Sequence, residues 1–451
     1  MTTYARRLGL FSGTMAVIGG IIGGGIFRTP AAVAQRVGSP ALFLVAWVLG
    51  GIIALIGAFC FGELGQRQPR AGGGYVYLRE AFGPLAGFLY GWTLLLVMTT
   101  GAIAAVSITF ADYLLALLGL GPALRLPLAI GAIVLLAFIN YVGVKPAAVT
   151  QNIFTILKLV ALTVMIVAGL IIVALIPAPA LARPRPPLTA QGGVWSVVAT
   201  LGIALVPIVF TYGGWQQTNF IAEEIIEPER NLPRALVLGV VGVVAVYLFA
   251  NITYLRVLGL EGLAASTAPA ADVMRQALGN AGSRFIAAGI AASTFGFLNL
   301  VLLVTPRVLQ AMAADGVFFP RLAVLHPVYR TPTAAILVMA VWSILLTLSG
   351  TFGQLVDYVS FGDWLFFGLT VAGLFVYRSR DRGAPTPGRF RVPGYPITPA
   401  LFVMAAGYVV ISAVMSNPQN AVMGTVLILA GIPVYLYWKR RQVREPRSEN
   451  P

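Results

Sequence analysis

The sequence predicts an all-α, polytopic membrane protein with about twelve transmembrane helices. Of its 451 residues, 58% are hydrophobic and only 10% are charged, and the mean hydropathy is +0.88. This composition exceeds what the core of a soluble protein absorbs. Apolar stretches of about 20 residues, long enough to cross a hydrocarbon layer roughly 30 Å thick, recur along the whole chain. The spans are expected at 11–36, 40–65, 83–117, 126–144, 151–176, 194–226, 233–257, 284–312, 333–350, 353–377, 396–416 and 419–438.

The net charge of +15 is distributed by side of the membrane. Most Lys and Arg residues fall in loops that share a side with the N-terminus, among them Arg67, Arg378 and the basic tail 439–451. The positive-inside rule then places both termini in the cytoplasm. The expected location is the cytoplasmic membrane. The expected partner is therefore the lipid bilayer, and nucleic acid is not expected to bind.

Several functional classes are excluded by what the sequence lacks. The single Cys60 and the single His326 leave no disulfide framework and no His/Cys metal site. No glycine-rich nucleotide loop occurs, so no cofactor is expected and the driving energy must come from gradients. An enzyme needs a cluster of His, Cys or carboxylates at one depth, and a channel needs repeated charged rings. Neither pattern is present, whereas a ligand-sensing receptor remains an alternative.

The first span contains "VIGGIIGGGIF", residues 17–27, in which Gly23, Gly24 and Gly25 are consecutive. Each glycine costs a helix roughly 1 kcal/mol relative to alanine, so the helix is expected to open there. Freed backbone groups are tolerated in a bilayer only beside protein or a water-filled cavity, which indicates a site. The alternative is that the glycines only form small-xxx-small packing faces.

The sixth span reads "VPIVFTYGGWQQTNFIAEE", residues 206–224, and has Gly213 and Gly214 in its middle. Two spans five apart in order are therefore interrupted, which is the pattern of a transporter's binding site. Half-helix N-termini face anionic groups there, and unwound carbonyls face cations.

Such a site suits a zwitterion, because an amino acid carries both charges on one carbon. Its carboxylate is expected on the N–H groups around Gly24 and Gly25, next to Gly23. Its ammonium is expected at the carbonyls of Ile21, Phe210 and Gly213.

Four stretches carry a family resemblance: "GGIIGGGIF", "QNIFTILKLVAL", "FTYGGWQQTNFIAEEIIEPERNLPRA" and "ASTFGFLN". Together they resemble the amino acid, polyamine and organocation transporters, most closely the L-type amino acid transporter branch, over residues 10–440. The resemblance implies a five-plus-five inverted repeat, the leucine-transporter-like fold, with repeats at 11–176 and 194–377 and two appended helices at 396–438. It also implies alternating access, with Phe210 as the aromatic gate over the substrate.

The chain departs from the family at two places. Mammalian relatives often carry a cysteine between spans 3 and 4 for linkage to a heavy chain, but residues 118–125 contain none, so no disulfide-linked heavy chain is expected. Gly24 stands where many relatives have serine, so the substrate carboxylate must rely on backbone donors or on water.

Lys158 matches the lysine that, in this family, places an ammonium where sodium-dependent relatives bind a cation between spans 1, 5 and 8. Its expected partners are carbonyls of residues 19–22 and the hydroxyls of Ser293 or Thr294. Two roles are open: a proton carrier, or a charged latch between the moving and fixed helices. Sodium dependence is not expected.

Asp363 is expected near the middle of the tenth span, where an ionisable residue is costly. It is either a structural residue or part of the substrate cavity, at a position where L-type relatives contact the substrate side chain. An aspartate there disfavours anionic side chains and suits neutral polar or cationic ones.

Other charges are expected to be structural. Glu63, Asp112 and Asp357 lie near span ends. The acidic cluster around Glu223 and Glu224 is either a gate latch or a solvated face.

The function predicted from these features is secondary-active amino acid transport by alternating access, with no enzymatic activity. Na⁺-independent exchange of neutral amino acids is the first choice. Proton-coupled symport, including symport of cationic amino acids, is the alternative.

Overall fold

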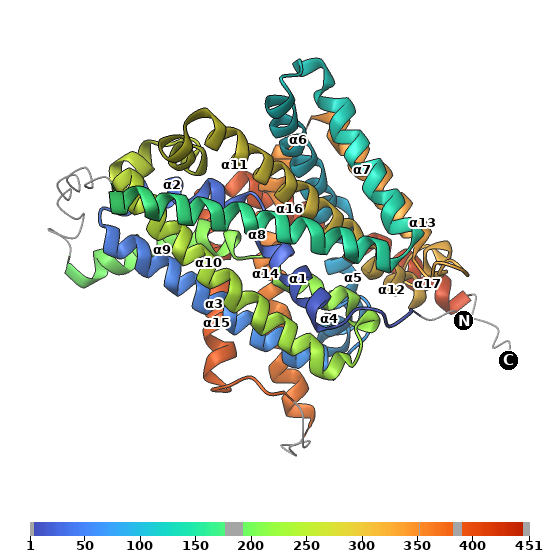
Figure 1. Cartoon of the computed structure of the whole chain (residues 1–451). Coiled ribbons are helices and arrows are strands. Elements are labelled where there is room, and N and C mark those ends of the chain that lie inside the picture. Colours follow the sequence, from blue (N-terminus) through green and yellow to red (C-terminus); the bar gives the residue numbers. More distant parts are fainter. Residues whose placement is uncertain (1–3, 176–192, 351, 382–389, 445–451) are drawn as a thin grey trace.

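The computed structural model describes residues 4–175, 193–350, 352–381 and 390–444, and their helices form one bundle (Figure 1). In this part of the chain nine helical segments are long and apolar enough to cross a membrane, and Leu10–Ile21 and Thr333–Ser349 are shorter apolar helices. The all-α membrane fold is therefore confirmed. The proline-rich stretch 176–188 and the end of the basic tail, 445–451, lie outside the described residues.

The first five expected spans are all helical, and two of them, the first and the third, consist of more than one helical segment. They are α1 (Leu10–Ile21) with η1 (Gly25–Phe27) and α2 (Thr29–Ala34); α3 (Pro40–Arg67); α5 (Pro84–Thr93) with η2 (Leu94–Met98) and α6 (Thr99–Leu118); α7 (Arg125–Val142) after η3 (Pro122–Leu124); and α8 (Val144–Leu175). A further helix, α4 (Gly74–Phe82), lies between the second and third spans and was not predicted, because its mixed polar and apolar sequence has no membrane signature.

The second half of the chain is also helical. It comprises α9 (Gly193–Thr211) with η5 (Trp215–Glu224), α10 (Pro228–Ala265), α11 (Pro269–Val304), α12 (Pro306–Ala314), η6 (Pro320–Ala323), α13 (Thr333–Ser349), α14 (Phe352–Arg380), α15 (Ile397–Ser416), α16 (Pro418–Leu429) and α17 (Gly431–Arg444). Helix α10 is longer than the expected 233–257 because it starts with a proline-containing first turn and continues through a bend at Gly259, where φ is +69°.

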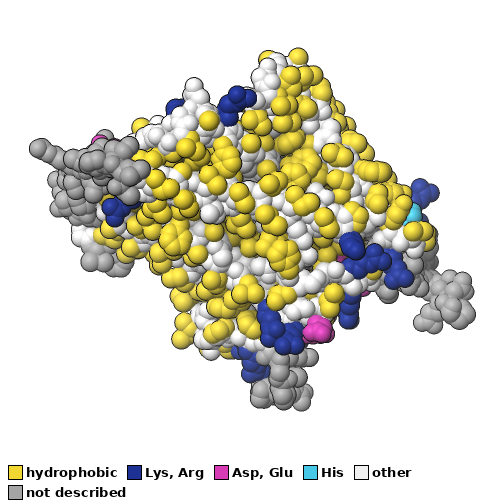
Figure 2. All heavy atoms as spheres, viewed as in Figure 1, with side chains coloured by type: hydrophobic (Ala, Val, Ile, Leu, Met, Phe, Trp, Pro, Cys, Tyr) yellow, Lys and Arg dark blue, Asp and Glu magenta, His cyan; other side chains and the backbone are white. Residues whose placement is uncertain are grey.

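The broken first span occupies the centre of the bundle. Helix α1 packs against α10, α8 and η5, while α3 packs along α10 and α11 packs along α8 and α6. In Figure 1, α8 and α10 cross in front of the bundle, and α6 and α7 stand beside them. Figure 2 shows a broad hydrophobic band over this face, with Lys and Arg side chains gathered at its edges.

Glu63 is a structural residue, as expected for a carboxylate near a span end. It is 1% exposed and accepts hydrogen bonds from Arg67 (2.9 Å), Arg378 (2.9 Å) and the backbone N–H of Val392 (2.7 Å). These contacts join α3, α14 and the segment that enters α15, so the cluster stabilises that end of the bundle. Asp112 likewise pairs with Arg125 at 2.7 Å on an exposed surface, and the side chain of Asp357 lies outside the described residues.

Candidate functional site

The first span opens where its consecutive glycines lie. Helix α1 ends at Ile21, and the chain resumes as a single 3-10 turn at Gly25. In the described part of the chain the N–H groups of Gly24 and Gly25 donate no hydrogen bond, and a side chain at Gly24 would meet open space. The opened backbone therefore offers two free donors to a ligand.

The sixth span opens between Thr211 and Trp215. Gly214 has a φ of +113°, which side-chain-bearing residues rarely adopt, and its N–H donates to Gln216 Oε1 at 3.0 Å. After it the chain continues as a 3-10 helix and not an α-helix.

The two openings touch at a pair of glycines. A Cβ atom on Gly214 would lie 2.2 Å from the carbonyl oxygen of Gly20, and one on Gly20 would lie 2.7 Å from the carbonyl oxygen of Gly214. Backbone therefore packs directly on backbone, and only glycine fits on either side. A small-residue contact was the alternative explanation of the first glycine run, and it holds at Gly20 in addition to the helix opening at residues 23–25.

Two tyrosines of α10 fasten the unwound segments. The Tyr247 hydroxyl lies 3.1 Å from the carbonyl oxygen of Ile21 and 3.4 Å from that of Thr211, so one side chain spans both openings. Tyr254, two turns along, donates to the carbonyl of Ile26 at 3.3 Å. Ile21 also accepts from Gly23 at 2.9 Å, so this carbonyl, expected to meet the substrate ammonium, already has two donors.

We expect Tyr247→Phe to weaken substrate binding about fivefold and to lower stability by about 1 kcal/mol, the usual net value of one neutral hydrogen bond. Competition for uptake and thermal unfolding measure the two effects. Tyr437→Phe, at a tyrosine that is 59% exposed, is the matched control. Identical behaviour of the two variants would contradict the role of the Tyr247 hydroxyl.

Lys158 of α8 is fully buried and reaches the first opening. Its ammonium donates to the carbonyls of Gly19 at 3.1 Å and Ile22 at 2.6 Å. Ser293 of α11 donates to the carbonyls of Ile22 and Gly23, both at 3.2 Å. Neither hydroxyl expected as a partner bonds to the Lys158 ammonium: Ser293 shares only the Ile22 carbonyl with it, and the Thr294 hydroxyl donates to the carbonyls of Ile290 and Ala291 in its own helix.

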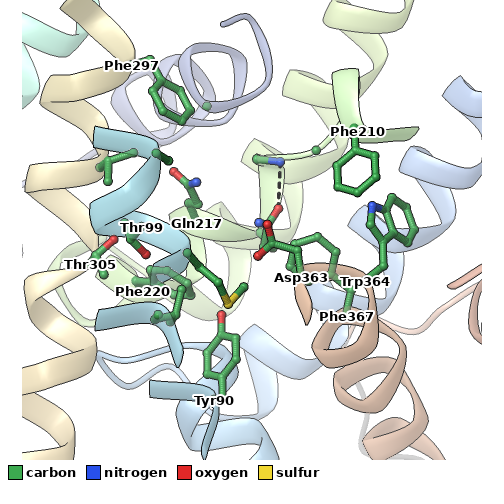
Figure 3. Close-up of a pocket in the computed structure, with 18 residues that line it drawn as sticks. Tyr90, Thr99, Phe210, Gln217, Phe220, Phe297, Thr305, Asp363, Trp364 and Phe367 are labelled. Atoms are coloured by element: carbon green, nitrogen blue, oxygen red, sulfur yellow. Dashed lines mark hydrogen bonds between the residues drawn. The ribbon is translucent and has the colours of Figure 1, made fainter. Parts of the chain in front are cut away.

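A cavity of about 180 Å³ lies beside the two openings (Figure 3). Phe210, Gly213 and Asp363, all proposed from the sequence, line it, whereas Ile21, Gly23, Gly24 and Gly25 do not. The complete lining is Gly20, Tyr90, Leu94, Met98, Thr99, Ala102, Phe210, Gly213, Gly214, Gln216, Gln217, Phe220, Phe297, Val301, Thr305, Asp363, Trp364 and Phe367. The site residues expected from sequence thus divide between the cavity wall and the opened backbone beside it.

Phe210 packs edge-on against Trp364, with ring centroids 6.3 Å apart and ring planes at 79°. Figure 3 places both rings on the side of the cavity away from Tyr90. The contact puts two aromatic rings at one wall of the cavity, and the role of Phe210 as a gate stays a prediction.

Several lining residues had no signal in the sequence. Leu94 and Met98 belong to a π-helical segment, η2, where one turn of the third span is widened, and π-bulges are frequent at functional sites. Tyr90, Thr99 and Thr305 resemble ordinary polar residues within apolar spans, whereas Gln217 is one of the polar residues that flank the glycine pair of the sixth span. They can be found only once the fold shows that α5, α6 and the junction of α11 with α12 meet at the opened helices.

Beyond the cavity, Glu224 and Arg307 form a buried ion pair at 2.8 Å, with side chains 1% and 0% exposed. Glu224 lies on η5 with the lining residue Phe220, and Arg307 lies in the first turn of α12, directly after the lining residue Thr305. Glu224 is therefore not part of a solvated face. The N-terminal segment covers the pair: Arg7 and Leu8 donate to the Glu224 carbonyl at 3.0 Å each.

Comparison with known proteins identifies a family. The family model described as "Amino acid permease" matches residues 8–438. The chain is 33% identical to the mouse (Mus musculus) "Large neutral amino acids transporter small subunit 2", over 97% of this chain and 82% of that protein. It is 32% identical to the mouse "Asc-type amino acid transporter 1", over 97% and 82%, and 31% identical to the mouse "b(0,+)-type amino acid transporter 1", over 97% and 89%.

The matches cover nearly the whole chain, and the two opened spans lie where the family resemblance expects them. The chain belongs to the amino acid permease family, in the L-type branch of the amino acid, polyamine and organocation transporters, and it is an amino acid transporter and not an enzyme.

Proposed function

We propose that this protein exchanges neutral amino acids across the cytoplasmic membrane without sodium. The observation that carries the proposal is the Lys158 ammonium on the Gly19 and Ile22 carbonyls. A buried positive charge that already satisfies these carbonyls takes the place of a coupling cation. The names of the relatives, two of which specify neutral or Asc-type amino acid transport, support this substrate class.

The free N–H groups of Gly24 and Gly25 are the proposed carboxylate site. The carbonyl of Gly213, on the neighbouring opening, is the proposed ammonium acceptor, because Ile21 and Phe210 already accept bonds from the chain itself. A substrate held this way extends its side chain into the cavity below Phe210.

The two openings also support the division into inverted repeats at 11–176 and 194–377, since each lies in the first span of its half. Alternating access then moves the opened helices against the rest of the bundle. The basic residues around α4 and α17 support cytoplasmic termini.

The relatives named "small subunit" are, by that name, parts of larger assemblies. We propose that any comparable partner of this chain associates without a disulfide, because its one cysteine, Cys60, is fully buried in α3.

The test is labelled-leucine uptake into proteoliposomes with or without internal unlabelled amino acid. Exchange predicts uptake that requires the internal amino acid and is unchanged when external sodium is replaced. Uptake into empty vesicles driven by an inward proton gradient would instead establish symport and make Lys158 the leading proton carrier. Sodium-driven uptake would refute both.

A further inference from the structure

A surface that is both aromatic and basic lies where α17 meets the segment between α12 and η6; we call it the α17 surface. The rings of Phe319 and Trp438 pack edge-on there, with centroids 5.0 Å apart, so the two elements are in direct contact. The Arg441 guanidinium lies 5.8 Å from the centre of the Trp438 ring. Figure 1 places α12 and α17 at the end of the bundle where both termini lie, and Figure 2 shows Lys and Arg side chains gathered at that edge of the hydrophobic band.

Three cations of the α17 surface have no partner within the part of the chain that the structure describes. Arg321 of η6 and Lys439 and Arg440 of α17 are exposed, and none of them takes part in an ion pair or a hydrogen bond there. Asp315, the acid nearest to Arg321 in the sequence, already binds Tyr75 and Arg79 of α4. The described residues therefore leave the positive charge of this surface unbalanced.

An apolar stripe on the outer face of the last span leads to these cations. Exposed side chains recur there at a spacing of three and four, which places them on one face of a helix. The stripe consists of Val422, Val426, Leu429, Pro433, Leu436 and Arg440. Ala430, between α16 and α17, keeps helical backbone angles, so the stripe continues across the junction. Apolar side chains thus come first along the span and a cation comes last.

A phospholipid has the same order, with acyl chains followed by a phosphate. Tyr437 and Phe319 are 59% and 56% exposed beside the cations, and aromatic side chains are typical of the headgroup level of a bilayer. Basic clusters directly after a transmembrane helix attract anionic lipids. A zwitterionic headgroup brings its own ammonium to this surface, whereas an anionic headgroup does not, so the unbalanced cations favour the anionic one.

We propose that Arg321, Lys439 and Arg440 bind the phosphate of an anionic phospholipid from the leaflet on the side of the termini. Its acyl chains lie along the apolar stripe of α16 and α17. Because Arg321 belongs to η6 and the other two cations belong to α17, one headgroup joins the last span to the segment that follows α12. This inference depends neither on the transported amino acid nor on exchange.

Thermal unfolding of the detergent-solubilised full-length protein tests the site, with phosphatidylglycerol and phosphatidylcholine of the same acyl chains as probes. Phosphatidylglycerol is expected to raise the unfolding midpoint of the wild type by about 3 °C or more, because a ligand that binds only the folded state stabilises it. Phosphatidylcholine is expected to have less than half of this effect. The combined variant Arg321→Gln, Lys439→Gln and Arg440→Gln is expected to need about tenfold more phosphatidylglycerol for half of the shift, since three attracting charges are lost.

The matched control is the combined variant Arg256→Gln, Arg275→Gln and Arg284→Gln, which removes the same charge from exposed residues of α10 and α11. It is expected to respond to phosphatidylglycerol as the wild type does. An equal loss of response in both variants would show attraction to the net charge alone and would overturn the site. Stabilisation of the wild type by phosphatidylcholine, or by inorganic phosphate, to the same extent as by phosphatidylglycerol would overturn it too.

Discussion

Replacing Lys158 by alanine is expected to lower amino acid exchange about tenfold or more while the protein still folds and reaches the membrane. The ammonium makes two charge-assisted hydrogen bonds to the opened segment of the first span, each worth about 1.5 to 3 kcal/mol. Without them the carbonyls of Gly19 and Ile22 lose the fastening that joins α1 to α8. Alanine leaves no buried charge behind, so the effect falls on the position of the substrate site more than on folding.

Lys145→Ala is the matched control, since Lys145 lies in the same helix but is exposed. Exchange rate and the amount of monodisperse purified protein are measured for both variants. An exchange rate of Lys158→Ala equal to that of the wild type would show that the lysine only fills space in the bundle. Loss of folded protein in parallel with activity would assign it a structural role only.

The openings of the two spans were predictable because their cause is local. Consecutive glycines weaken a helix wherever they stand, and residues 23–25 and 213–214 supply that weakness without any partner. Length and hydropathy located the spans for the same reason. The contact between Lys158 and the first opening was expected from the family resemblance and has the expected geometry, although its role in transport remains a prediction.

The remaining features depend on partners that are distant in the sequence. Arg307 had no assigned role in the sequence, because only folding brings it to Glu224, 83 residues away. Ser293 and Thr294 were alternative expected partners of Lys158. Ser293 instead donates to carbonyls of the first opening, and Thr294, turned from it by about 100° on the helix, donates to carbonyls of α11 itself. The π-helical turn that begins at Leu94 contains no glycine or proline from which it could be predicted.

Replacing Arg307 by alanine is expected to destabilise the protein by about 3 to 5 kcal/mol, because the Glu224 carboxylate is left buried without its counter-charge. The guanidinium donates to Glu224 through Nε at 2.8 Å and also to the carbonyl of Leu303, and the Tyr4 ring lies 5.8 Å from it. Its loss therefore loosens the N-terminal segment as well as the junction of η5 with α12.

A double-mutant cycle separates the interaction between Arg307 and Glu224 from the cost of burying each charge. Arg307→Met combined with Glu224→Leu removes both charges and keeps apolar volume, so the double variant is expected to be more stable than either single variant. Thermal unfolding of the purified protein ranks the variants.

Arg275→Ala is the control, because Arg275 forms an exposed pair with Asp272 at 3.2 Å and such pairs contribute at most about 1 kcal/mol. If Arg307→Ala unfolds no earlier than this control, the buried pair does not hold η5 to α12. Strictly additive single variants would show instead that each charge acts on its surroundings independently of the other.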